Sequence, residues 1–159
     1  LQTHGKLTHA VIYHPLTQDL FVAVKGQGAQ LNDHRIRVSA DTQLSGILFS
    51  AGIPSSAEHS HHIVDVMRLM QEEHCILRRS GSTALDLAFV GSGALQAFWA
   101  MDVKPWDVAA GALLVREAGG MVLDAYGRED FLWGGSILAA SAKLMKHILP
   151  RIQLPTLPR

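Results

Sequence analysis

The sequence of 159 residues contains one cysteine, few aromatic side chains and no excess of charge of either sign. Cys75 has no partner for an intrachain disulfide, which favours a reducing compartment, and we expect a cytoplasmic protein. Fourteen Lys and Arg residues balance fourteen Asp and Glu residues, which argues against a basic surface for nucleic acid or anionic lipid. No apolar run approaches the ~20 residues of a membrane helix, so we expect no membrane partner.

The apolar content is that of a folded domain. Hydrophobic residues make up 48% of the chain and charged residues 18%, whereas disordered proteins are poor in apolar residues and rich in net charge. Aromatic residues make up only 6%, while glycine and alanine are plentiful. This composition favours an α/β architecture in which helices pack closely on a sheet.

The hydrophobic pattern divides the chain into three parts. Residues 1–44 read as an antiparallel β-meander whose last strand spans 35–38, and residues 45–152 alternate strands with helices, which predicts an α/β domain. Residues 153–159 form a tail. The sequence begins at Leu1 without an initiator Met, and we expect it to be the C-terminal portion of a longer protein.

Histidine and cysteine offer weaker candidates. His59, His61 and His62 lie at the start of an amphipathic helix that Ser55 or Ser56 would cap, and a solvated helix start is favoured over a metal site. Cys75 falls in an apolar run that predicts a buried strand. A packing role for its thiol is favoured over nucleophilic catalysis.

Two junctions between a strand and a helix carry the stronger signal. Gly81, Ser82 and Thr83 precede a helix predicted over 83–90, where backbone N–H groups and hydroxyls can meet an anion, although a plain helix cap is the commoner use. Asp107 follows the Lys104-Pro105-Trp106 sequence at the start of a helix predicted over 107–118. It is either a helix cap or a carboxylate for Mg²⁺ beside a phosphate group.

The stretch from Trp106 to Gly120, which reads WDVAAGALLVREAGG, resembles the C-terminal signature of the inositol monophosphatase family over its full length. The segment RSGSTALDLA at 79–88 is similar to the one that precedes this signature in the family. Val11 to Pro15, the turn at 26–29 and Leu31-Asn32 are similar to the family's β-meander. The resemblance covers at least residues 5–150.

This resemblance implies a layered α/β/α/β/α sandwich of the sugar-phosphatase type whose N-terminal part is absent from this chain. It also implies a homodimeric, Mg²⁺-dependent phosphomonoesterase for small phosphorylated substrates such as inositol-1-phosphate. In such enzymes metal ions activate water and neutralise charge on the phosphoryl group. Asp107 matches a catalytic metal ligand, and Gly81, Ser82 and Thr83 match a segment that contacts substrate hydroxyls and phosphate.

The chain departs from the family pattern in two ways. The family's other metal ligands come from a Glu-Glu pair and an Asp-Pro-x-Asp-Gly motif before the meander, and we expect these upstream of Leu1; Glu72-Glu73 lies in the wrong place. Ala100 stands at a substrate-binding position where inositol phosphatases commonly have Glu, so we expect broad substrate use.

Two alternatives to an inositol-phosphate phosphatase stay open. One is a phosphatase of the same superfamily that acts on a sugar bisphosphate or a 3′-phosphonucleotide. The other is a non-catalytic regulatory or binding module, because bacterial relatives are also accessory factors for RNA polymerase, a role that needs no metal site. We expect no useful phosphatase activity from the segment 1–159 alone, because a single carboxylate ligand holds Mg²⁺ weakly.

Overall fold

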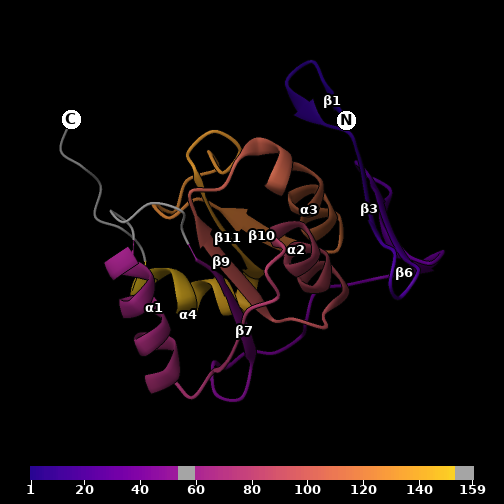
Figure 1. The fold of residues 1–159 in the computed structure, drawn as a ribbon. Helices are drawn as coiled ribbons and strands as arrows, with labels where there is room; N and C mark the ends of the chain where they lie inside the picture. The colour runs from indigo at the N-terminus through magenta and orange to yellow at the C-terminus, as the bar shows by residue number, and fades with distance from the viewer. Residues whose placement is uncertain (54–59, 153–159) are drawn as a thin grey trace.

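The computed structural model describes residues 1–53 and 60–152, in which two sheets lie on opposite sides of a pair of helices (Figure 1). The first part of the chain forms short strands: β1 (Gln2–Thr3), β2 (Lys6–Leu7), β3 (His9–His14), β4 (Asp19–Val24), β5 (Gly28–Leu31) and β6 (His34–Arg35). Strands β1 and β2 pair as a small separate hairpin. The proposed tail 153–159, and with it His59, Ser55 and Ser56, lies outside the described residues.

Strands β3 to β6 form an antiparallel four-stranded sheet in sequence order. Val11 pairs with Val22 and Tyr13 with Leu20, so these side chains share the sheet's outer face. The prediction of a last strand over 35–38 is wrong. That strand ends at Arg35. The Ile36 N–H still donates to the carbonyl of Ala29 at 3.0 Å, but the chain then leaves the sheet, and the Val38 N–H donates to the carbonyl of Ala118 at 3.2 Å.

The second sheet has five strands in the order β10-β11-β9-β7-β8. Strands β7, β8 and β9 are parallel, and β11 runs antiparallel to β9 and β10. The carboxyl ends of the three parallel strands therefore meet at one edge of the sheet. Their bounds, with those of the remaining strands, are β7 (Leu48–Gly52), β8 (Ile76–Arg78), β9 (Ala97–Met101), β10 (Gly120–Leu123) and β11 (Ser136–Ser141).

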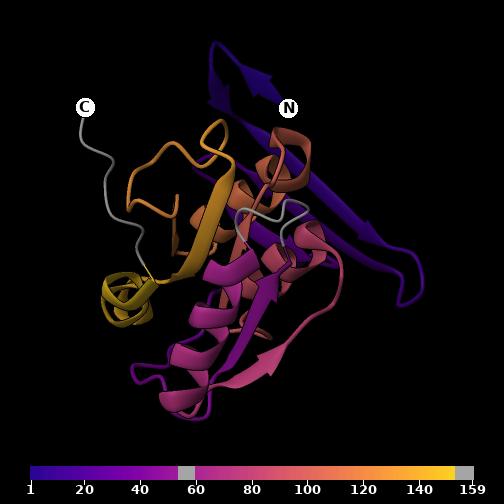
Figure 2. The ribbon, with the colours of Figure 1, turned by 60° about the vertical axis from the view of Figure 1, so that its left-hand side comes forward.

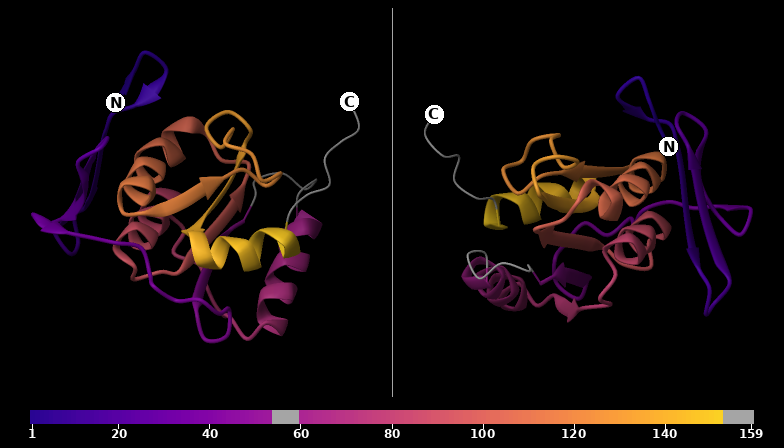
Figure 3. Two further views of the ribbon diagram at one scale, coloured as in Figure 1. Left: turned by 180° about the vertical axis from the view of Figure 1, so that it is seen from behind. Right: turned by 45° about the horizontal axis from the view of Figure 1, so that its top comes forward.

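Helices cover both faces of the five-stranded sheet (Figures 2 and 3). One face packs against α1 (Ser60–Glu72) and α4 (Ala142–Ile152), and the other against α2 (Thr83–Ser92) and α3 (Pro105–Glu117). The opposite sides of α2 and α3 pack against the four-stranded sheet, through residues such as Ala88 and Leu114. The described residues thus build four successive layers, helix, sheet, helix and sheet, of the expected sandwich.

Helices α2 and α3 run parallel and in close contact. Leu87 packs directly on the backbone of Gly111, where a side chain would have no room, and Gly91 lies against the backbone of Leu114. The contact of Leu87 with Gly111 is thus followed, about one turn later on both helices, by the contact of Gly91 with Leu114, as expected for parallel helices. Thr83 and Asp107 lie one turn before Leu87 and Gly111, in the first turns of α2 and α3.

Glu117 joins α3 to the four-stranded sheet. Its two carboxylate oxygens accept the backbone N–H groups of Gly26 and Gly28, each at 2.9 Å. The turn between β4 and β5 is therefore fixed to the end of α3.

Two sequence expectations need correction. Strand β8, predicted to be buried, is an edge strand with an exposed Ile76, although Cys75 just before it is buried. His62, predicted to be solvated, lies edge-to-face with the ring of Trp99 at a centroid distance of 5.4 Å. In addition, none of the described helices is long and apolar enough to cross a membrane.

Candidate active site

The turn at 80–83 follows the carboxyl end of β8 and begins α2. Gly81 has a φ of +87°, a left-handed conformation that glycine adopts without a steric cost. Ser82 is the N-cap: its backbone is extended, and its Oγ accepts the N–H of Leu85 at 3.4 Å. The plain capping role that the sequence allowed is thus present, and the first N–H groups of α2 face the same edge of the sheet.

Asp107 lies in the first turn of the neighbouring helix. Helix α3 begins at Pro105, two residues earlier than predicted, because Lys104 is held extended before proline and serves as the N-cap. The Lys104 N–H donates to Asp107 Oδ2 at 3.1 Å. Capping does not exclude a ligand role, because a carboxylate has lone pairs to spare after accepting one hydrogen bond.

The fold brings these two junctions to one edge of the sheet. Both helices start from the carboxyl ends of parallel strands, which is where ligands gather in open α/β sheets. A cavity of about 100 Å³ opens there. Its lining includes Gly52, Arg79, the turn residues Gly81, Ser82 and Thr83, and the carboxylate of Asp86, whereas Asp107 is not among its lining residues.

Ala100 does not line this cavity. It is 1% exposed, belongs to the core between α2 and the sheet, and leaves no space for a side chain at Gly52 on the adjacent strand. A methyl group in this position presents no polar atom to a bound molecule. Whether its substitution for Glu broadens substrate choice stays a prediction.

Asp86 was not singled out in the sequence and is the most unusual polar group of the site. It is 5% exposed, and the Ser50 hydroxyl donates to its Oδ2 at 3.0 Å. Burial raises the pKa of the Asp86 carboxyl, and hydrogen bonds from Ser80 and Ser50 oppose that rise. One sign in the sequence indicated that Asp86 could be buried: it lies between two apolar pairs, Ala84-Leu85 and Leu87-Ala88.

Comparison with known proteins identifies the family. The model of the inositol monophosphatase family matches residues 1–154. The chain belongs to this family. Its match includes both strand-to-helix junctions described above.

Several members of the inositol monophosphatase family are similar to this chain. The protein named Nus factor SuhB of Pseudomonas aeruginosa is 41% identical over 97% of this chain and 58% of its own length. The inositol-1-monophosphatase of Mesorhizobium japonicum is 36% identical over 98% and 59%. The crystal structure of extragenic suppressor protein suhB from Bartonella henselae superposes with a TM-score of 0.92 at 36% identity, over 96% of this chain and 58% of that one. The chain thus spans about three fifths of these relatives.

The donor set for a metal is incomplete in this part of the family fold. Across residues 1–53 and 60–152, the structure holds no group of three or more His, Cys, Asp or Glu side chains placed to bind a metal ion. Mg²⁺ is usually held by one or two carboxylates together with substrate phosphates and water. Asp107 alone therefore does not make a complete Mg²⁺ site.

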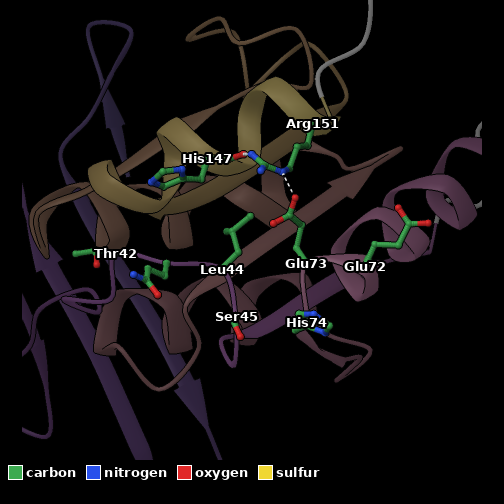
Figure 4. A pocket seen from close by; sticks show the side chains of 9 residues that line it. Thr42, Leu44, Ser45, Glu72, Glu73, His74, His147 and Arg151 are labelled. Atoms are coloured by element: carbon green, nitrogen blue, oxygen red, sulfur yellow. Dashed lines mark hydrogen bonds and ion pairs between the residues drawn. The ribbon is translucent and has the colours of Figure 1, made fainter.

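A larger cavity, of about 650 Å³, lies at the opposite edge of the sheet (Figure 4). It is lined by polar residues that the family resemblance does not single out: Thr42, Gln43, Ser45, Glu72, Glu73, His74, His147 and Arg151, with Leu44. Arg151 Nε donates to Glu73 Oε1 at 2.6 Å across it.

Cys75, just behind this cavity, is an inert thiol. Burial, with a contribution from the nearby Glu73 carboxylate, raises the pKa of Cys75 to about 11, although Arg151 lowers it in part. The Cys75 thiol donates to the carbonyl of Leu44 at 3.3 Å. A protonated, buried thiol is a poor nucleophile, which supports the packing role expected from the sequence.

Proposed function

We propose that a longer protein containing this chain hydrolyses small phosphate monoesters, with inositol-1-phosphate among its substrates. The observation that supports the proposal is that the 80–83 turn and Asp107 both lie at helix starts on the carboxyl edge of the sheet, in a chain of this family. Helix N-termini favour the negative charge of a phosphate, and a carboxylate beside a phosphate needs a cation between them.

In this proposal Asp107 is both a catalytic residue and one ligand of Mg²⁺. Gly81, Ser82 and Thr83 contact the phosphate and the hydroxyl groups of the substrate. In this proposal the other ligands are those of the family pattern, the Glu-Glu pair and the Asp-Pro-x-Asp-Gly motif that precede the meander, because the described residues complete no metal site. The proposal includes a homodimer, a cytoplasmic location and a division into a meander at 1–44 and an α/β domain at 45–152.

The test is the Asp107→Asn substitution in the longer protein. Asn keeps an acceptor for the Lys104 N–H, so the loss of stability should stay within about 1 kcal/mol. Loss of a metal ligand should lower Mg²⁺-dependent turnover of inositol-1-phosphate by more than about 100-fold, since even groups that merely support a ligand cost about 10- to 100-fold.

The matched control is Asp65→Asn, which removes a carboxylate from the exposed side of α1 and should leave turnover unchanged. The isolated chain of 159 residues should show no turnover in the same assay. An Asp107→Asn enzyme that is active and saturable with Mg²⁺ would end the assignment of Asp107.

A regulatory role is the second candidate, because the relative at 41% identity is named a Nus factor. Such a role would involve contact with RNA polymerase and would not depend on the metal ligand. The Asp107→Asn protein should then bind purified RNA polymerase as the unchanged protein does, and a longer protein that binds polymerase but hydrolyses no phosphate monoester would favour this candidate.

A further inference from the structure

The described residues bury two acidic side chains, Asp86 and Asp124, in different ways. Asp124 accepts the backbone N–H groups of Tyr126 and Arg128, and the Arg128 guanidinium pairs with it at 2.8 Å. Its loop thus stabilises its charge. Asp86 instead accepts the hydroxyl of Ser50, which supplies no positive charge. A carboxylate buried in this way is costly and calls for an explanation beyond stability.

The hydrogen bonds of Asp86 connect the sheet to the turn at the candidate site. On one side, the fully buried Ser50 of β7 donates to its carboxylate at 3.0 Å. On the other side, Ser80 in the turn lines the same cavity as Asp86, and its hydroxyl lowers the pKa of the Asp86 carboxyl in part. The Asp86 carboxylate therefore lies between the central sheet and the segment that begins α2.

The Ser80 side chain is itself hydrogen-bonded to the backbone of the turn. Its Oγ accepts the N–H of Ser82 at 3.0 Å and lies 3.3 Å from the carbonyl oxygen of Ser82. A serine hydroxyl has one proton, so the Asp86 carboxylate and this carbonyl oxygen compete for it. When the proton points to Asp86, the hydroxyl presents its lone pairs to the N–H of Ser82.

We propose that Asp86 is a positioning residue for the phosphate-ester site: through Ser80 it fixes the 80–83 turn against β7 in the conformation that receives the substrate. The inference rests on the proposed function. The cavity of about 100 Å³ at this turn has Asp86 in its wall, as does a second cavity of about 350 Å³ on the side of Leu48 and Phe89. With open space on two sides, the turn relies on Ser80 and Asp86 to stay in place.

A purely structural role predicts different behaviour. If Asp86 only satisfied Ser50, its loss would lower stability without altering the turn. Ser80→Ala separates the two roles, because it removes the link to Ser82 and leaves the bond between Ser50 and Asp86 intact. Asp86→Asn keeps the size of the side chain but replaces one acceptor oxygen by a donor group.

The first experiment measures amide hydrogen exchange by NMR in the chain of 159 residues. Asp86→Asn and Ser80→Ala should each accelerate exchange of the Ser82 N–H by about tenfold or more relative to the global unfolding rate, because its acceptor is displaced or lost. Ser141→Ala is the control: it removes a comparable hydrogen bond, to the N–H of Leu144, at the start of α4. It should leave exchange at Ser82 unchanged.

The second experiment measures kinetics in the longer protein with inositol-1-phosphate. Asp86→Asn and Ser80→Ala should each raise KM about tenfold with kcat changed less than about threefold, and the double variant should add little. Unchanged exchange at Ser82 would overturn the inference, as would faster exchange with an unchanged KM. If the unchanged longer protein hydrolyses no phosphate monoester, the proposed function fails and the inference fails with it. Faster exchange at Ser82 in the variants would then show only that Asp86 fixes the turn.

Discussion

The two edges of the five-stranded sheet differ in what they offer a ligand. The amino edge has the larger cavity, about 650 Å³, and its acidic and basic side chains already pair, as Glu73 does with Arg151. The carboxyl edge has a cavity of about 100 Å³, but two helices begin there beside Asp107 and the 80–83 turn. Helix N-termini, whose first N–H groups have no partner within the helix, rather than cavity volume therefore mark the candidate site.

The topology explains this difference. Helices α1, α2 and α3 each start after the carboxyl end of a parallel strand and return to the amino edge, so their N–H ends gather at one edge and their carbonyl ends at the other. The N-termini of three helices favour anions at the first edge, whereas of the described helices only α4 begins at the second. Substitutions at the amino edge should therefore alter stability alone, and those at the carboxyl edge should alter substrate binding.

The largest effect expected at the amino edge is alkaline destabilisation through Cys75. The pKa of this thiol is raised from 9.0 to about 11 in the folded chain, so the folded state holds its proton more tightly than the unfolded state does. The contribution of the protonated thiol to the free energy of unfolding is complete below pH 9 and is lost as the pH rises through about 11. The total loss is about 2.7 kcal/mol at about 1.36 kcal/mol per pH unit.

Urea unfolding between pH 8 and pH 11 measures this loss. Cys75→Ser keeps a hydroxyl that can donate to the Leu44 carbonyl but does not titrate in this range, so its stability should fall less over the same interval. Parallel pH profiles for the two proteins would show that the thiol does not govern alkaline unfolding.

A matched pair of glycines compares the edges directly. Gly81 at the carboxyl edge has a φ of +87°, and Gly119, after the end of α3, has +89°; an added Cβ meets nothing within 4 Å at either. Changing each to Ala should therefore cost a similar ~1–2 kcal/mol of backbone strain. In the longer protein, only Gly81→Ala should raise KM for inositol-1-phosphate.

The equality of the two stability losses, measured by thermal unfolding of the chain, is the internal control for that comparison. An equal rise of KM in both variants would mean that strain itself, rather than its place, weakens substrate binding. The idea that the two edges have different functions would then be wrong.

Much of the fold follows from local sequence signals. Pro105 after an extended Lys104 marks the start of α3, Ser141 caps α4 through the N–H of Leu144, and the strand-helix alternation after residue 45 gives the layers. The exposure of Ile76 could not be predicted, because whether a strand lies at the centre or the edge of a sheet depends on strand order. Periodicity reports which face is apolar but not which strands are neighbours.

The candidate site was predictable only in part. The turn at 81–83 and Asp107 were found as strand-to-helix junctions and through a family signature, but the close approach of Leu87 to Gly111, which packs their two helices together, is a contact that no single segment reveals. Asp86 was missed because a helix with an acid in its first turn is an ordinary pattern in sequence. Its partner Ser50 lies 36 residues away on another element.

The smallest expected effect tests the pair at the amino edge. Arg151 Nε lies 2.6 Å from Glu73 Oε1, but the two side chains are 36% and 37% exposed, so water screens their attraction. Glu73→Gln should therefore cost less than about 1 kcal/mol, and the cost should shrink with added salt. Glu72→Gln, whose partner Arg68 is 62% exposed, is the control and should cost less still.

The same substitution links the pair to the thiol behind it. The Glu73 carboxylate raises the pKa of Cys75, so Glu73→Gln should make the alkaline loss of stability smaller and end it at a lower pH, although burial remains the larger cause of the raised pKa. KM for inositol-1-phosphate should not change in the longer protein, because the groups removed lie at the edge opposite the turn. A changed KM would show that the paired charges of the amino edge act on substrate binding across the sheet, and the two edges could not then be treated as independent.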